Sequence, residues 1–168
     1  MSDSDDIVRL NEICRRELLG RKVNRVKWLG FADMPLLDFE SLNTERIYIR
    51  LGHVDWLLTD QNTDQVIVTS KQPFDVFRVP VEKLTSTSVT RFEVFADRCL
   101  AFEADFDNGM RLRLDACETF YDDIDTPCWT LGCSDAHVIL VGMKLSTWRR
   151  IHKNEPVYGD PKHPSNET

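Results

Sequence analysis

The stretch CWTLGCSDAHVILV, residues 128–141, aligns without a gap with DWLLTDQNTDQVIV, residues 55–68. The alignment pairs Trp129 with Trp56, and apolar residues alternate with other residues around both tryptophans. A period of two is typical of β-strands that bury one face. Each stretch is therefore predicted to form two strands joined by a turn.

Further matches lie upstream, in the same order in both halves of the chain, which is the signature of an internal repeat. They pair Val23 and Val26 with Val89 and Phe92, Leu37 and Phe39 with Leu100 and Phe102, and Ile47, Ile49 and Leu51 with Met110, Leu112 and Leu114. We interpret residues 21–69 and 87–142 as two copies of a five-strand unit, joined by a connector over 70–86. The alternative is that two unrelated meanders share the same alternation.

Short apolar runs separated by polar turns predict many antiparallel strands. The predicted strands are 23–31, 35–42, 46–51, 55–59, 64–68, 89–95, 99–106, 110–114, 128–131 and 137–141. The expected fold class is α+β and mainly antiparallel β, with the two meanders packed as a sandwich or partly closed barrel.

Two helices are expected outside the strands. Over residues 4–19 the apolar residues recur at steps of three and four, and Ser4 and Gly20 suit the two ends of a helix. A short helix is predicted over 146–152, where it would pack against the sheet. The fold then forms a single domain over 1–153, and the Pro-rich residues 154–168 are expected to be a flexible tail.

Composition argues against several classes of partner. The 168-residue chain has 28 acidic and 21 basic residues and a net charge of -7, which repels nucleic acid and anionic lipid. The sequence contains no run of 18 apolar residues, which is the pattern that would predict a membrane span. An odd number of cysteines, five, without a signal sequence favours a reducing cytoplasm.

The cysteines raise two chemical hypotheses. Cys128, Cys133 and His137, with Cys117 upstream, could contribute to a zinc site, or Cys133 and His137 could form a nucleophilic pair. The spacing lacks the close cysteine pairs of structural zinc sites, and the repeat places aspartates at the corresponding positions of the first copy. Ordinary strand and turn residues are the favoured interpretation, and no metal or other cofactor is predicted.

The second copy contains a loop, ETFYDDIDTPC, that the first copy lacks. The candidate partner-binding residues in it are Phe120, Tyr121, Asp122, Asp123 and Asp125. Surface loops carry binding residues more often than strands do, and aromatic rings beside carboxylates suit a basic protein surface. The alternative is a solvated acidic loop.

The motif G-x-x-V-x-x-V at Gly20, an L-x-F strand pair, DNGMRLRL at 107–114 and a later W-x-L resemble small β-rich bacterial domains. Some of these domains are immunity proteins of polymorphic-toxin systems. The resemblance covers about residues 20–142 and implies a cytoplasmic, non-enzymatic protein that binds a toxin domain and blocks it.

The sequence therefore favours a protein-binding module. Two alternatives stay open: a metal- or thiol-dependent enzyme that uses the cysteines and histidine of residues 117–137, and a structural or regulatory module that forms homodimers through sheet edges.

Overall fold

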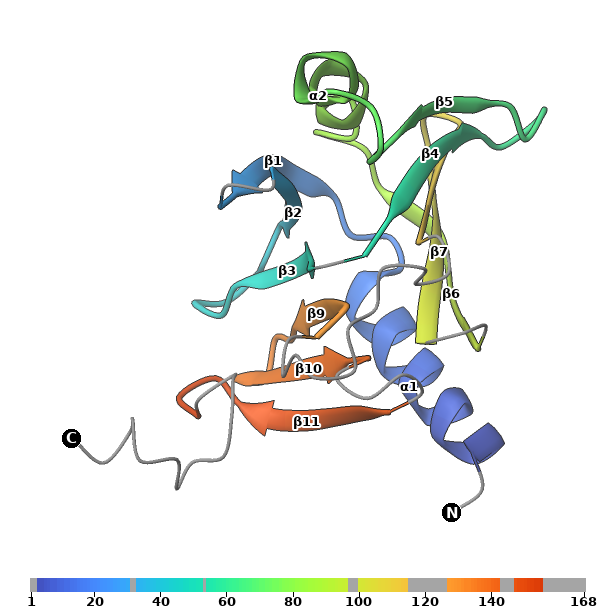
Figure 1. Ribbon diagram of the computed structural model, residues 1–168. Helices are drawn as coiled ribbons and strands as arrows, with labels where there is room; N and C mark the ends of the chain where they lie inside the picture. Colours follow the sequence, from blue (N-terminus) through green and yellow to red (C-terminus); the bar gives the residue numbers. More distant parts are fainter. Residues whose placement is uncertain are drawn as a thin grey trace.

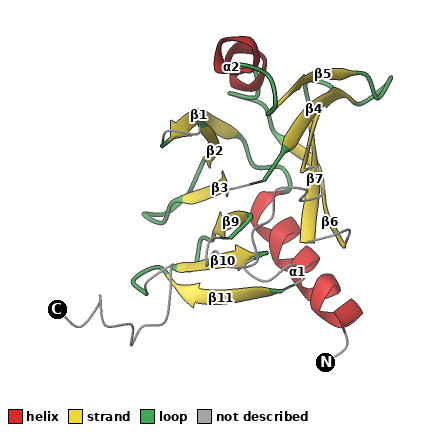
Figure 2. Ribbon diagram, in the orientation of Figure 1, coloured by secondary structure: helices red, strands yellow, loops and turns green. Residues whose placement is uncertain are grey.

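The computed structural model describes residues 3–30, 33–52, 54–96, 100–114, 127–142 and 147–155. The helices are α1 (Asp3–Leu18) and α2 (Phe74–Glu82). The strands are β1 (Val23–Leu29), β2 (Met34–Phe39), β3 (Ile47–Leu51), β4 (Trp56–Asp60), β5 (Val66–Thr69), β6 (Val89–Ala96), β7 (Leu100–Phe106), β8 (Met110–Leu114), β9 (Trp129–Gly132), β10 (His137–Val141) and β11 (Trp148–His152) (Figures 1 and 2).

The strands form two antiparallel sheets. The first sheet has the order β1-β2-β3-β9-β10-β11, and the second has the order β5-β4-β8-β7-β6. Each of the ten strands predicted from alternation is present, and so is the N-terminal helix. The predicted class, α+β with mainly antiparallel strands, is confirmed.

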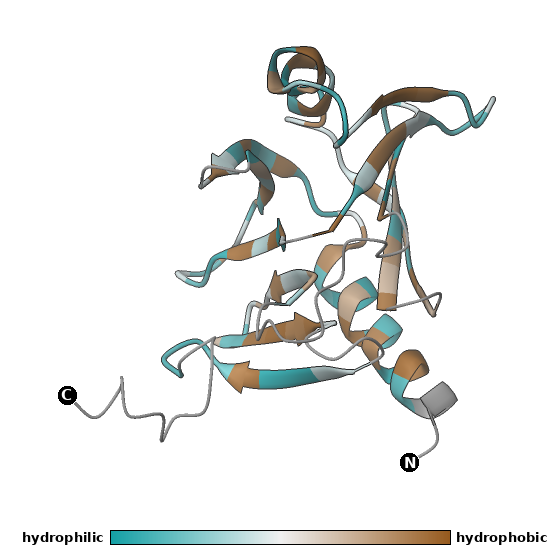
Figure 3. Cartoon of the chain, viewed as in Figure 1, coloured by the Kyte–Doolittle hydropathy of each residue, from teal (hydrophilic) through white to brown (hydrophobic). Residues whose placement is uncertain are grey.

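The main core brings together side chains from both sheets, as in a sandwich. Apolar and polar residues alternate along strands such as β3, which gives one face to this core, whereas β9 is buried along its whole length (Figure 3). Trp129 of the first sheet is fully buried and meets Phe102 of the second in an edge contact, with ring centroids 4.9 Å apart. Aromatic contacts therefore join the two layers at the centre of the molecule.

The chain changes sheet after β3 and again after β8. The strand β3 pairs with β9, which places Leu51 opposite Trp129. The strand β8 pairs with β4, which places Leu114 opposite Trp56. Strands from the two halves of the chain consequently lie side by side in both sheets (Figure 1).

Helix α1 covers the free edge of β6. The Asn11 side chain donates to Val94 O at 3.0 Å and accepts from Val94 N at 2.7 Å. Arg15 Nε donates to Phe92 O at 3.1 Å. Among the residues that the structure describes, no strand pairs with this edge of β6, and polar groups of the helix take its place.

One expected element is wrong. The segment predicted as a helix over 146–152 contains β11, whose Ile151 lies opposite Val138 of β10 and is buried with it. Trp148 and Ile151 are three residues apart, which suits one face of a helix, whereas in the strand they lie on opposite faces and pack against different clusters. Pairing with the edge of β10 satisfies the backbone groups of the strand.

The connector over 70–86 contains α2, which was not predicted. Phe77 and Val81 turn inward from this helix, and Phe77 meets Trp56 with ring centroids 5.1 Å apart. Pro80 inside the helix obscured the signal, because proline usually ends a helical pattern.

Candidate functional site at the β9–β10 turn

Of the cysteines singled out in the sequence, the two that the structure describes, Cys128 and Cys133, do not lie in one site. Cys128 and Cys133 flank the two ends of β9, where their N–H groups donate to Val141 O and His137 O. Five residue steps of extended chain separate their Cα atoms by about 16 Å. Cys117 lies outside the described residues, so its position relative to Cys128 stays untested.

Burial controls the chemistry of the described thiols. It raises the pKa of Cys128 to about 11, and burial together with the charges of Glu17 and Asp135 raises the pKa of Cys133 to about 12. Burial likewise raises the pKa of Cys14. At neutral pH these thiols are protonated, whereas a cysteine nucleophile acts as the thiolate.

The structure does bring together a different set of side chains, which we call the turn cluster: Glu17, Cys133 and Asp135. One carboxylate oxygen from each acid and the sulfur of Cys133 all lie within 4.8 Å of one another. Glu17 comes from the last turn of α1, and the other two come from the turn between β9 and β10. Glu17 is only 3% exposed, which is rare for a carboxylate.

Hydrogen bonds hold both carboxylates of the turn cluster in place. Ser134 donates to Glu17 through its N–H at 3.3 Å and its hydroxyl at 3.1 Å. Asp135 accepts from Arg150, and the His137 ring Nδ1 lies 3.4 Å from Asp135 Oδ1. Burial would raise the pKa of Asp135, but Arg150 and the His137 N–H outweigh it and hold that pKa below its usual value.

Glu17 was missed in the sequence because its partners lie more than 100 residues away. Only its position, three residues after Cys14 on the buried face of a helix, offered a signal. His137, by contrast, was predicted near Cys133, and the structure places it beside Asp135.

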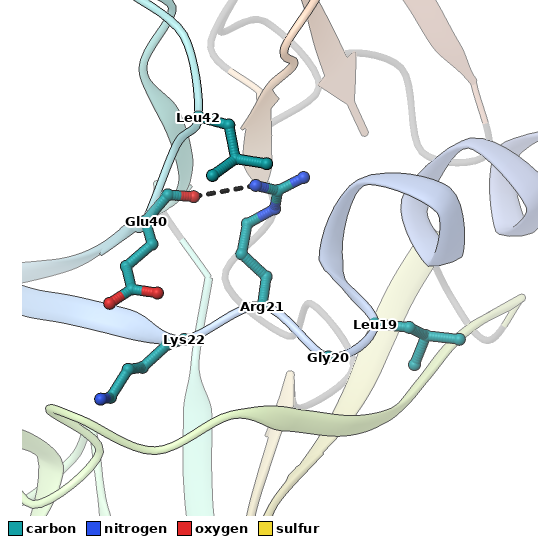
Figure 4. Close-up of a pocket in the computed structure, with 6 residues that line it drawn as sticks. All are labelled: Leu19, Gly20, Arg21, Lys22, Glu40 and Leu42. Carbon is teal, nitrogen blue, oxygen red and sulfur yellow. Dashed lines mark hydrogen bonds between the residues drawn. The ribbon is translucent and has the colours of Figure 1, made fainter.

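The hollow drawn in Figure 4 is a less suitable site. It has a volume of about 270 Å³ and is lined by Leu19, Gly20, Arg21, Lys22, Glu40 and Leu42. Arg21, the central cation, already donates to the main-chain oxygens of Glu17 and Glu40. The hollow therefore offers a ligand few uncommitted polar groups.

A second surface lies on β5 and α2, two elements in contact. Large apolar side chains are unusually exposed here, namely Val66 (51%), Ile67 (38%), Val76 (45%) and Val79 (50%). We call these four residues the β5–α2 surface. Because β5 ends the second sheet, no strand pairs with its outer edge among the described residues.

The acidic loop that carries the predicted partner-binding residues, Phe120, Tyr121, Asp122, Asp123 and Asp125, lies outside the described residues. Its C-terminal end is anchored, since Gly52 N donates to Cys128 O at 2.7 Å. Its role in binding stays a prediction.

A network of ion pairs covers the outer face of β6, β7 and β8. Asp105 accepts from Arg91 Nε at 2.9 Å and from Arg111 Nε at 2.7 Å. Burial alone would raise the pKa of Asp105, but the hydrogen bonds from Arg111 and Arg91 outweigh it and lower the pKa. The arginines and the carboxylate neutralise one another, and we therefore assign this network a structural role.

The change Asp105→Asn is expected to reduce the free energy of unfolding by about 1–2 kcal/mol at pH 7, because charged hydrogen bonds are lost. A carboxyl group with a lowered folded pKa stabilises above its unfolded pKa, about 3.9, and this stability is lost as the pH falls through the folded value. Urea unfolding from pH 7 to pH 2.5 should therefore show a shallower acid decline for the variant. The exposed Asp75→Asn is the control, and equal slopes for D105N and the wild type would contradict the linkage.

A scan of protein-family models and searches of curated proteins and of solved structures found no match to this chain. Over the described ranges, neither helix is long and apolar enough to cross a membrane.

Proposed function

We propose that the protein is a non-enzymatic binding module that takes an extended segment of a partner protein as an additional strand beside β5. The observation that carries this proposal is the β5–α2 surface, where a sheet edge and exposed apolar side chains occur together. Strand addition uses the free N–H and C=O groups of such an edge for affinity and neighbouring apolar residues for specificity.

The first sheet supplies a template for this mode of binding. There β11 pairs with the outer edge of β10, with Arg149 opposite Leu140. Trp148 at the start of β11 lies against α1, since its Nε1 donates to Asp6 O at 3.2 Å. A partner strand beside β5, with an apolar side chain on Val76 and Val79 of α2, would repeat this arrangement.

The register of β5 supports the comparison. In the second sheet Val68 of β5 lies opposite Leu58 of β4, and in the first sheet Ile139 of β10 lies opposite Leu131 of β9. Ile67 and Thr69 therefore correspond to Val138 and Leu140 of β10, which lie opposite residues of β11. The Thr69 N–H at present donates to Gln72 Oε1 at 2.8 Å. An incoming strand would replace this local bond with a ladder bond.

We also propose that the chain contains two copies of one unit, each with a helix followed by five strands. An ion pair occurs at the same place in both copies. Arg25 of β1 lies opposite Asp38 of β2, with a distance of 3.1 Å between the charged groups. Arg91 of β6 lies opposite Asp105 of β7, with a distance of 2.9 Å. Each pair follows a register shift next to the first residue of its strand, Val23 or Val89. The matching register of β3 with β9 and of β8 with β4 supports the same proposal.

Strand pairing changes part of the alignment. Phe39 lies opposite Val23 and Phe106 lies opposite Val89, which equates Phe39 with Phe106 and not with Phe102. Likewise Val68 corresponds to Ile139 and not to Val141. A register shift between Leu58 and Thr59 and a longer turn before β5 absorb the difference.

The proposed partner is basic, because the net charge of -7 favours oppositely charged surfaces. The exposed Asp64 and Asp75 lie next to the β5–α2 surface in sequence. The immunity-type resemblance suggests a toxin domain met in the cytoplasm.

The change Ile67→Lys tests the binding proposal. A lysine on the edge of β5 repels a basic strand and discourages strand pairing, and we expect at least a tenfold loss of partner affinity. The matched control is Leu42→Lys, which makes the same kind of change at a fully exposed leucine outside the surface. Proteins of the native cell would be captured on the wild type and on both variants.

Support would be a protein retained by the wild type and L42K but lost by I67K, whose binding slows hydrogen exchange at the Ile67 and Thr69 amides. If the wild type retains no protein, or I67K retains the same proteins, the proposal is overturned. In sedimentation, the wild type could show a mass that rises with concentration while I67K does not. This result would identify the occupant as a second copy of this chain, and it would overturn the basic partner in favour of a homodimer.

A further inference from the structure

We propose that the turn cluster of Glu17, Cys133 and Asp135 holds a zinc ion that joins the end of α1 to the β9–β10 turn. The starting observation is geometric. Three possible ligand atoms from two separate elements already lie within 4.8 Å of one another. In a tetrahedral zinc site, with bonds of 2.0–2.3 Å, ligand atoms lie about 3.3–3.8 Å apart. Adjustments of about 1 Å would therefore close the site around an ion.

The ligand types favour zinc among the common metals. A thiolate sulfur with carboxylate oxygens suits a borderline-soft divalent ion, whereas calcium and magnesium select oxygen alone. A site composed only of acids would give no such preference. The sulfur of Cys133 distinguishes this cluster from an ordinary group of carboxylates.

The Cys133 thiol is itself an independent indication. It is 1% exposed, yet within the described part of the chain its hydrogen-bond contact is Leu131 O at 3.9 Å, which is long even for sulfur. A buried polar group normally has a closer partner. The cluster sets the carboxylates of Glu17 and Asp135 beside this sulfur, and Arg16 and Arg150 contact them from the outer side.

The surroundings resemble the outer shell of a metal site. Each carboxylate is oriented by a further group, Glu17 by the N–H and hydroxyl of Ser134 and Asp135 by Arg150. Such bonds fix the direction of metal ligands. The His137 ring Nδ1, 3.4 Å from Asp135 Oδ1, adds a further contact that orients this carboxylate.

This site differs from the zinc hypothesis raised by the cysteine spacing. It keeps Cys133, leaves out His137 and also Cys128 at the far end of β9, and adds two acids that the spacing did not indicate. Its role would be structural, because ligands from α1 and from the turn are held by one ion. Zinc binding to the folded state alone would then raise the thermal stability of the protein.

The test uses the full chain, purified without chelator and titrated with zinc. We expect about one equivalent bound and a higher melting temperature with zinc than without it, as for a folded site of the usual affinity. Cys133→Ser and Glu17→Gln should each lower zinc affinity at least tenfold. The matched control, Cys128→Ser, removes a buried thiol at the other end of β9 and should leave zinc affinity unchanged.

Cobalt serves as a second probe, since its thiolate charge-transfer band reports a sulfur ligand directly. The band should be present in the wild type and in C128S and absent in C133S. Circular dichroism of the metal-free variants would show whether each still folds. The proposal is overturned if the wild type takes up less than about 0.1 equivalents of zinc, or if C133S binds zinc as tightly as the wild type.

Discussion

Replacing Trp129 with alanine is expected to lower the free energy of unfolding by about 3–5 kcal/mol, as for other large-to-small changes at aromatic core positions. Trp129 is fully buried and joins the two sheets through its contacts with Phe92 and Phe102. Its Nε1 also donates to Leu100 O at 3.0 Å, so the variant leaves both a cavity and a carbonyl without its partner. Urea unfolding followed by circular dichroism would measure the loss.

Two further variants separate the contributions of Trp129. Trp129→Phe keeps most of the ring but removes the bond to Leu100, and an intermediate loss of about 1–3 kcal/mol is expected. Trp148→Ala removes a tryptophan that is only partly buried and should have a smaller effect. If W129A and W148A destabilised the protein equally, the contacts of Trp129 between the two sheets would have no special importance for stability.

Replacing Asn11 with alanine is expected to lower the free energy of unfolding by about 2–4 kcal/mol, because two buried backbone groups lose their partners. Both the N–H and the C=O of Val94 bond to the Asn11 amide, at 2.7 Å and 3.0 Å. Alanine leaves this part of the β6 edge under α1 without hydrogen bonds. Chemical denaturation of the wild type and the variant would give the difference.

The amide geometry offers a sharper version of the same test. Asn11→Asp keeps an acceptor for the Val94 N–H but sets a carboxylate oxygen against the Val94 carbonyl, so it should not restore stability. Glu12→Ala, at the exposed neighbouring position, should change the free energy of unfolding by less than about 0.5 kcal/mol. A similar small change for N11A would show that α1 does not cap β6 through this side chain.

The candidate site was only partly predictable from the sequence. Cys133 and His137 are four residues apart, and a local pattern was sufficient to associate them. Glu17 joins Cys133 and Asp135 only because α1 packs beside the β9–β10 turn, and no local period encodes such a long-range contact. Cys128 was grouped with Cys133 from spacing alone, but the extended strand between them carries the two residues apart.

The chemistry of the thiols also required the fold. The spacing of the cysteines suggests a zinc site and a nucleophile equally well. Burial of Cys133 beside Glu17 and Asp135 raises the pKa of its thiol, so a thiolate that is not bound to a metal is disfavoured. The β5–α2 surface was not foreseen for a similar reason. Exposure of Val66 and Val79 depends on which neighbours cover them, and α2 itself was not predicted.

The sequence by itself determined α1, ten of the eleven strands and, along alternating strands such as β3, the face that turns inward. These features follow local rules, since apolar residues recur with the period of the backbone that carries them. The tertiary structure alone decided that β3 pairs with β9, that β4 pairs with β8, and that 148–152 extends a sheet. Alternation of apolar and polar residues indicates which face of a strand is buried, but it does not indicate which other strand pairs with that strand. Packing of the aromatic core and pairing of backbone groups across the whole chain select the partner.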